Sequence, residues 1–233
     1  MIQVENVAIC GWEPAVRGMR NPMNSWEKSD SVCSYDSDEL PLYIIGNNDK
    51  KLMKALVAAG TDHRKFMRMI TVSLDITAPL YWWKEFDTYK VGTVANSCST
   101  MHKIAEKEFI LDDFSHEHLG VTVPAKLNDG EEVFQNLWIE SLKRTIEDLN
   151  IARGLYISEQ NSDLKKKYWW QMIQLLPSSY NQKRTVMLNY EVLANIYKSR
   201  RNHKLDEWRE FCHWVEGLPY SELITGVSNE QTN

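Results

Sequence analysis

Residues 70–77 constrain the fold most tightly, because their hydrophobic pattern repeats every second residue. The apolar side chains are Ile70, Val72, Leu74 and Ile76, and they alternate with Thr71, Ser73, Asp75 and Thr77. This alternation predicts a β-strand with one buried face and one polar or functional face. From Glu131 onward, apolar residues recur at helical spacing instead. Strands followed by helices predict an α+β fold in a single domain over residues 1–233.

Other elements follow from hydrophobic period, capping residues and breakers. We expect a strand at Ile2–Ile9 and helices at Asp49–Ala59, Leu80–Tyr89, Glu131–Ile151, Asp163–Leu176, Arg184–Arg201 and Leu205–Glu216. Residues 77–79 are expected to start a helix, because proline is tolerated in a first helical turn. Residues 21–41, rich in Ser, Asp, Asn and Pro, predict a loop insertion. From Val91 we expect a hydroxyl-rich loop and then a turn or short helix, and irregular structure at 112–130.

Charge and cysteine content argue against several classes of protein. The formal net charge is −5, whereas a general nucleic-acid binder usually presents a basic face. The four cysteines are scattered and form no C-x-x-C pair, so neither a zinc site nor a disulfide framework is expected. The first residues lack a basic start followed by an apolar core, and no apolar run approaches the roughly 18 residues of a membrane span. We therefore expect a cytoplasmic protein with no membrane segment and no bound metal.

Asn189 and Arg200 are polar residues at positions that the expected helix Arg184–Arg201 would bury. At about 100° per residue they fall nearly on one line, in the middle of an apolar arc. The arc consists of Leu188, Val192, Leu193 and Ile196. A buried charge is costly unless it is paired or bound to a ligand. Arg200 therefore needs an anion, which is either a ligand or a carboxylate reached on a neighbouring helix.

A second group of polar residues follows the segment Lys84–Lys90. Lys90 and the hydroxyl groups of Thr93, Ser97 and Ser99 would suit a phosphate group, with charge from the lysine and donors from hydroxyls and loop amides. The segment has no Gly-rich fingerprint and no G-K-[ST] motif. A solvated helix end with an ordinary polar turn therefore explains the pattern as well.

Three further features each have a functional and an ordinary explanation. Cys98 is either an accessible nucleophile or an inert small residue, since the sequence fixes no histidine beside it. The run His63-Arg64-Lys65 presents cations either at the mouth of a site or simply on the surface. His116 and His118 alternate beside acidic residues, a pattern compatible with metal binding but unspecific for it.

Several landmarks follow the alternating strand in a fixed order. They are Ala78-Pro79, the hydroxyl-rich loop, Leu176-Pro177, Asn189, Asn195 and Arg200. This order resembles the flavin-dependent thymidylate synthase family. That family has an Ala-Pro helix after a strand, a signature R-H-R-x-x-S-x-N-E-x-S-x-R-Y, and a late L-P segment followed by N-x5-N-x4-R. Ala15-Val16-Arg17 is similar to the family's early A-x-R helix, so the likeness spans residues 15–216.

The resemblance implies an antiparallel sheet in the N-terminal half and a mainly helical C-terminal half. The family moves a methylene group from methylenetetrahydrofolate to a deoxyuridine nucleotide, with FAD as carrier and reductant and NADPH as the hydride source. It is typically a homotetramer with sites at subunit interfaces. A pyrimidine deoxynucleotide is therefore the implied substrate, and FAD is the implied cofactor.

Site residues are implied where this sequence aligns with the family pattern. Arg200 would face the pyrimidine or phosphate and is the residue that we expect to be catalytic. Flavin contacts are implied for Asn189, Asn195, Tyr89, Lys90 and Thr93. The further substrate-binding residues implied are Glu85, Thr88, Ser97, Cys98 and Ser99.

The signature itself is altered in this chain. The family's R-H-R falls on Thr88, Tyr89 and Lys90, and its activating serine falls on Cys98. Two further family arginines fall on Ile173 and Glu191. Each lost cation removes about 1.5–3 kcal/mol of charge-assisted binding. The alternative function is therefore an inactive or repurposed scaffold of the same fold that binds a nucleotide or a protein partner. A purely structural homo-oligomer is disfavoured, because it would have no need for inward polar residues.

Overall fold

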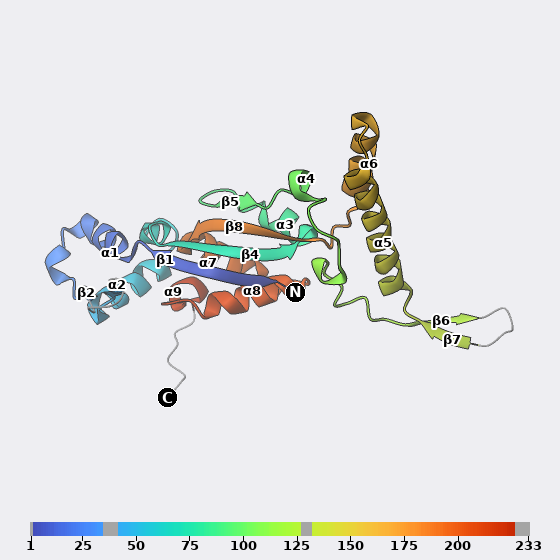
Figure 1. Ribbon diagram of the computed structural model, residues 1–233. Helices are drawn as coiled ribbons and strands as arrows, with labels where there is room; N and C mark the ends of the chain where they lie inside the picture. Colours follow the sequence, from blue (N-terminus) through green and yellow to red (C-terminus); the bar gives the residue numbers. More distant parts are fainter. Residues whose placement is uncertain (1, 35–41, 127–131, 227–233) are drawn as a thin grey trace. The chain divides into compact units, whose positions relative to one another are not determined.

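The structure is a computed structural model that describes residues 2–34, 42–126 and 132–226 (Figure 1). The chain divides into two compact units. The hairpin unit consists of Thr77–Glu85 and Ser97–Arg184. The α7 unit consists of Ile2–Ile76, Phe86–Asn96 and Thr185–Asn233. A single domain over the whole chain stays a prediction.

Four strands form the main sheet, in the order β1-β4-β8-β5. Their bounds are Gln3–Cys10 for β1, Thr71–Pro79 for β4, Val94–Ser97 for β5 and Asn181–Asn189 for β8. The two predicted N-terminal strands are therefore confirmed. In β4 burial follows the alternation, with Val72, Leu74 and Ile76 buried and the residues between them half-buried.

The predicted helix start at residues 77–79 is wrong. These residues end β4, and α3 (Leu80–Phe86) begins directly after Pro79. A residue that precedes proline is driven out of the helical region by the proline ring, so Ala78 stays extended. The loop expected from Val91 is also partly wrong, because β5 lies within it, although the short helix α4 (Thr100–Lys103) follows as expected.

Strand β8 corrects the predicted helix Arg184–Arg201. Residues 184–189 belong to the strand, and α7 (Tyr190–Arg200) begins only after Asn189. Val186 and Leu188 are buried, and the residues between and beside them are more exposed. The hydrophobic pattern of so short a segment is compatible with both a strand and a helix. Pairing with neighbouring strands of the sheet makes the segment a strand.

Helix α7 packs against α8 (Asp206–Glu216) and α9 (Glu222–Thr225), with α1 (Trp12–Arg20) and α2 (Asn47–Ala58) elsewhere in the α7 unit (Figure 1). The core of this unit contains large aromatic side chains that are almost fully buried: Phe86, Tyr190, Trp208 and Phe211. The predicted helices at 49–59 and 205–216 are confirmed.

The buried carboxylate of Asp49 fixes the segment before β2 in the α7 unit. It accepts hydrogen bonds from Arg20 Nε, Ser29 Oγ and Ser31 Oγ, each at 2.6 Å. Residues 21–23 and 26–28 form 3-10 turns, and β2 (Val32–Ser34) pairs antiparallel with β3 (Leu42–Ile44). Residues 35–41 lie outside the described residues, so a loop insertion at 21–41 stays a prediction.

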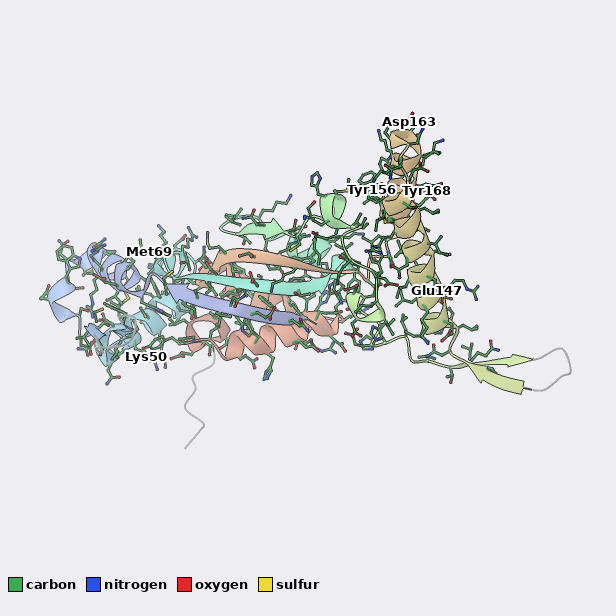
Figure 2. The ribbon with its side chains drawn as sticks, viewed as in Figure 1. Lys50, Met69, Glu147, Tyr156, Asp163 and Tyr168 are labelled. Carbon is green, nitrogen blue, oxygen red and sulfur yellow. The ribbon has the colours of Figure 1, made fainter. Side chains whose placement is uncertain are left out.

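The hairpin unit is built on two long helices, α5 (Leu137–Ser158) and α6 (Ser162–Leu175), which pack side by side. In Figure 2, Glu147 and Tyr156 mark α5, and Asp163 and Tyr168 mark α6. The buried core beside them consists of Ile104, Phe109, Phe114, Leu142, Ile146, Leu149, Ala152 and Met172. The predicted helix at 163–176 is confirmed.

The expected helix Glu131–Ile151 starts too early. Asn136 caps α5, since its Oδ1 accepts a hydrogen bond from Ile139 N at 3.3 Å, and this cap sets the helix start. The residues before it form β7 (Glu132–Gln135), which pairs antiparallel with β6 (Val123–Lys126). Residues 123–126 are therefore not irregular, contrary to the prediction for 112–130.

The predicted fold class is confirmed: the protein is α+β, with an antiparallel sheet in the N-terminal half and a mainly helical C-terminal half. Strand β8 is the part of the C-terminal half that joins the sheet. Within the described ranges, no helix combines the length and apolarity needed to cross a bilayer.

Candidate functional site

Arg200, at the end of α7, is held between aromatic side chains of the α7 unit. Its guanidinium carbon lies 4.8 Å from the ring centroid of Trp208 and 5.7 Å from that of Tyr89. Its Nε donates a hydrogen bond to the Tyr89 hydroxyl at 2.9 Å, and its Nη1 lies 3.0 Å from His203 Nε2. The inward position of Arg200 is thus supported by aromatic faces and a phenol, which fix the orientation of the guanidinium plane.

Tyr89 also lines a cavity of about 280 Å³. The other lining residues are Phe86, Asp87, Lys90, Thr93 and Ala95. Thr93 Oγ1 is buried and has no hydrogen-bond partner among the described residues. A buried hydroxyl without a partner is costly, and a ligand oxygen or nitrogen would satisfy it. Lys90 and Asp87 are both exposed at the same cavity, so its rim carries one cation and one anion.

Asn189 caps α7 instead of lying within a helix. Its Oδ1 accepts a hydrogen bond from Val192 N at 3.0 Å, which satisfies one of the free N–H groups at the helix start. Its Nδ2 lies close to Gly92, at 2.9 Å from the point where a Cβ on that glycine would stand. The amide of Asn189 therefore has its oxygen committed to the helix and its amino group beside the loop that bears Thr93.

We expect Gly92→Ala to disturb this arrangement, since Gly92 has a φ of +78° and a Cβ there would meet Asn189. The strained backbone alone should lower the free energy of unfolding by about 1–3 kcal/mol, measured by urea denaturation. Gly120→Ala is the matched control, because a Cβ at Gly120 meets nothing within 4 Å. Equal unfolding curves for the two variants would contradict the assignment of this loop geometry.

Asn195 lies on a different face of α7 from Asn189 and Arg200. It is exposed, and its Oδ1 accepts a long hydrogen bond from Arg64 Nη2 at 3.5 Å. It lines a separate cavity of about 430 Å³. The structure therefore brings Tyr89, Lys90, Thr93 and Arg200 together and places Asn195 at a second cavity of the same unit.

The whole chain is similar to known nucleotide-binding enzymes. It superimposes on flavin-dependent thymidylate synthase ThyX from Helicobacter pylori complexed with FAD and dUMP, with a TM-score of 0.62 over 96% of this chain and 97% of that chain, at 15% identity. It is also similar to the UMP/dUMP methylase PolB from Streptomyces cacaoi bound with 5-Br UMP, with a TM-score of 0.59 over 97% and 94% of the two chains, at 16% identity. The chain has the fold of the flavin-dependent thymidylate synthases. No model of a known protein family matches the sequence, and no curated protein matches it either.

In this thymidylate synthase fold, the altered signature continues into the hairpin unit. Ser97 ends β5 and is exposed. Cys98 is exposed, and its backbone N–H donates to Lys183 O at 3.0 Å. Ser99 Oγ caps α4 by accepting from His102 N at 3.1 Å. Glu85 is half-buried in the same unit, whereas Thr88, an exposed residue, belongs to the α7 unit.

The thymidylate synthase pattern has arginines at two positions where this chain has Ile173 and Glu191. Both of these side chains have structural roles here. Ile173 packs against the apolar core of the hairpin unit. Glu191 is buried in the α7 unit and forms an ion pair with Arg64, with 2.9 Å between Glu191 Oε2 and Arg64 Nε and 3.0 Å between Oε1 and Nη2. Nη2 donates the hydrogen bond of this pair, to Oε1, whereas Nε and Oε2 form no hydrogen bond despite their short distance.

Sequence reasoning missed Trp208, His203 and the role of Arg64. Trp208 belongs to the apolar face of α8, and its aromatic contact with Arg200 depends on how two helices pack, which the sequence does not encode locally. For Arg64 the sequence indicates only a cation, either on the surface or at the mouth of a site. Cys212, on α8, was given no role, and burial together with the charge of Glu216 raises the pKa of its thiol to about 12, so it stays protonated.

No group of three or more His, Cys, Asp or Glu side chains that could hold a metal ion occurs among residues 2–34, 42–126 and 132–226. His116 Nδ1 lies 2.8 Å from the carbonyl oxygen of Phe114. That contact is a local turn interaction within the hairpin unit.

Proposed function

We propose that this protein binds a flavin and a pyrimidine deoxynucleotide and transfers a methylene or methyl group to the nucleotide. The observation that carries the proposal is the fixed guanidinium of Arg200, joined through Tyr89 to a cavity with Lys90 and the unpartnered Thr93 hydroxyl. A guanidinium held in one plane suits a phosphate or the carbonyl oxygens of a pyrimidine. Similarity along nearly the whole chain to structures with FAD and dUMP supports the proposal.

The α7 unit has a cavity that would hold part of these ligands. A cavity of about 280 Å³ is slightly below the about 300–1,000 Å³ of small-molecule sites. We infer that it receives one end of a ligand, that FAD also contacts Asn189 and Asn195, and that a neighbouring subunit of a homotetramer completes the site. When bound, FAD supplies the carrier and redox chemistry, with NADPH and methylenetetrahydrofolate as co-substrates.

The residues of the chain bind and orient these ligands. Arg200 contacts the pyrimidine or its phosphate and stabilises charge there. Lys90 contributes a phosphate contact, and Thr93 donates a hydrogen bond. The proposed substrate contacts from the rest of the signature are Glu85, Thr88, Ser97, Cys98 and Ser99.

A repurposed binding scaffold is the second candidate, and one observation favours it. Ile173 stands where the family pattern has an arginine for the nucleotide phosphate, and its side chain packs against an apolar core. That position has no cation, so dUMP would be bound through fewer charge-assisted contacts. Under this alternative the protein binds a nucleotide or a protein partner without transferring a carbon unit.

The two candidates differ in the release of the C5 hydrogen of the uracil ring, which the incoming carbon must replace. We expect the protein to release tritium into water from dUMP labelled at C5, when FAD, NADPH and methylenetetrahydrofolate are all present. Omission of the folate is the control. Nucleotide binding without tritium release would contradict transfer of the carbon unit and favour the scaffold.

A further inference from the structure

The second cavity of the α7 unit, of about 430 Å³, is lined by three basic residues, one of which is paired with a carboxylate. Its basic lining residues are Arg64, Lys198 and Arg201, and none of its described lining residues is acidic. Lys198 and Arg201 are exposed on and directly after α7. Neither makes an ion pair with a described residue, although the Arg201 guanidinium lies 5.9 Å from the Tyr197 ring centroid. Unpaired cations that share a concave surface attract anions more strongly than isolated surface charges do.

Arg64 is fixed at the wall of this cavity. Its side chain is 20% exposed, and the buried Glu191 holds it through the ion pair described above. Its Nη2 also donates to Asn195 Oδ1, at 3.5 Å. Because the oxygen of Asn195 accepts from Arg64, its amino group remains as a donor at the cavity. The hydrogen bonds of Arg64 to described side chains come from Nη2, which leaves Nη1 uncommitted.

The charge of residue 191 differs from that in the family pattern. The family pattern has an arginine where this chain has Glu191, so α7 has lost one cation at that position. A guanidinium from the loop before β4 now pairs with Glu191 and lies beside Asn195. Arg64 therefore balances the charge of Glu191, and the net positive charge of the cavity comes from Lys198 and Arg201.

We propose that the cavity lined by Arg64, Asn195, Lys198 and Arg201 binds a phosphate or diphosphate group, with Arg64 as its fixed guanidinium. This inference rests on the proposed function for one source of that group, the diphosphate of FAD, but the same chemistry fits a free phosphate ester. Asn195 donates through its amino group, and Lys198 and Arg201 supply the remaining charge.

Inorganic pyrophosphate is the probe for the test, with the full chain and isothermal titration calorimetry. We expect the wild-type protein to bind it and Arg64→Gln to bind it about tenfold more weakly or worse, the loss expected for one charge-assisted contact. Lys65→Gln is the matched control: it removes one charge from an exposed neighbour that does not line the cavity, and its affinity should equal that of the wild type. Equal affinity in Arg64→Gln and Lys65→Gln, or no binding by the wild type, would overturn the proposal.

A second variant keeps the test decisive if Arg64→Gln does not fold. Lys198→Gln/Arg201→Gln alters only exposed side chains and leaves the Arg64–Glu191 pair in place, and it should also weaken pyrophosphate binding about tenfold or more. Unchanged affinity in this folded variant would contradict the anion site.

Comparison of FAD with riboflavin, which lacks phosphate, identifies the source of the anion. If the cavity takes the FAD diphosphate, Arg64→Gln weakens FAD binding and leaves riboflavin binding unchanged. Binding of pyrophosphate but not FAD by the wild type would support the anion site while the proposed flavin function fails. If the wild type binds FAD tightly but no cavity variant changes the affinity for pyrophosphate, the anion site fails while the proposed flavin function stands.

Discussion

Replacement of Asp49 by alanine is expected to destabilise the protein by about 3–5 kcal/mol, the cost of breaking a buried ion pair from one side. The Asp49 side chain has no exposed area and that of Arg20 is 5% exposed. Without the carboxylate, Arg20 would keep a buried charge with no anionic partner. The hydroxyl groups of Ser29 and Ser31 would lose their acceptor as well. Urea denaturation of the purified variant measures the effect.

The same carboxylate gives a pH dependence. Burial alone would raise the pKa of Asp49, but hydrogen bonds from Ser29, Ser31 and Arg20 and the charge of Arg20 outweigh it and lower the pKa. The stabilisation is therefore fully present above the unfolded value of about 3.9 and is lost as the pH falls through the lower folded value. We expect the stability difference between the wild type and Asp49→Ala to shrink in that acid range.

Asp148→Asn is the matched control, because Asp148 is an exposed aspartate on α5. It should change the free energy of unfolding by no more than about 0.5 kcal/mol. An Asp49→Ala protein as stable as Asp148→Asn at pH 7 would show that the buried pair does not hold the segment before β2.

Replacement of Arg200 by alanine is expected to give the largest loss of nucleotide affinity. Removal of one charge-assisted contact costs about 1.5–3 kcal/mol, which weakens dUMP binding about 10- to 150-fold. Arg200→Lys keeps the charge but loses the planar donor that meets the Tyr89 hydroxyl and the stacking on Trp208, so an intermediate loss is expected. Calorimetric titration with dUMP in the presence of FAD measures both.

Arg68→Ala removes an exposed arginine of the same unit and serves as the control for net charge. Its dUMP affinity should match that of the wild type. If wild type, Arg200→Ala and Arg68→Ala all bind dUMP equally, the aromatic-held guanidinium has no part in nucleotide recognition.

The sequence predicted two of the four strands of the main sheet and most of the longer helices, because their hydrophobic periods extend over long segments. The strand at 70–77 is one example, and the helix at 163–176 is another. It failed at residues 184–189, where the period is too short to separate strand from helix. That failure changed the meaning of Asn189, which is an N-cap at the junction of β8 and α7 and not a residue inside an apolar arc.

The candidate site was predictable only in part, for a physical reason. Arg200 could be found because a cation in an apolar arc needs a partner. Its partner Trp208 depends on helix packing, and the Arg64–Glu191 pair joins residues 127 positions apart. No local pattern encodes such contacts. The low sequence similarity to proteins of the same fold, 15% to ThyX, left few signature residues to guide the prediction.

The visible absorption spectrum of the purified protein, with and without added FAD, tests the central claim most directly. We predict a bound-flavin spectrum that is lost in the double variant Asn189→Ser/Asn195→Ala. Serine is chosen because it still caps α7 while lacking the amide amino group, so far-UV circular dichroism should be unchanged. A wild-type protein that remains colourless and takes up no FAD would contradict the account.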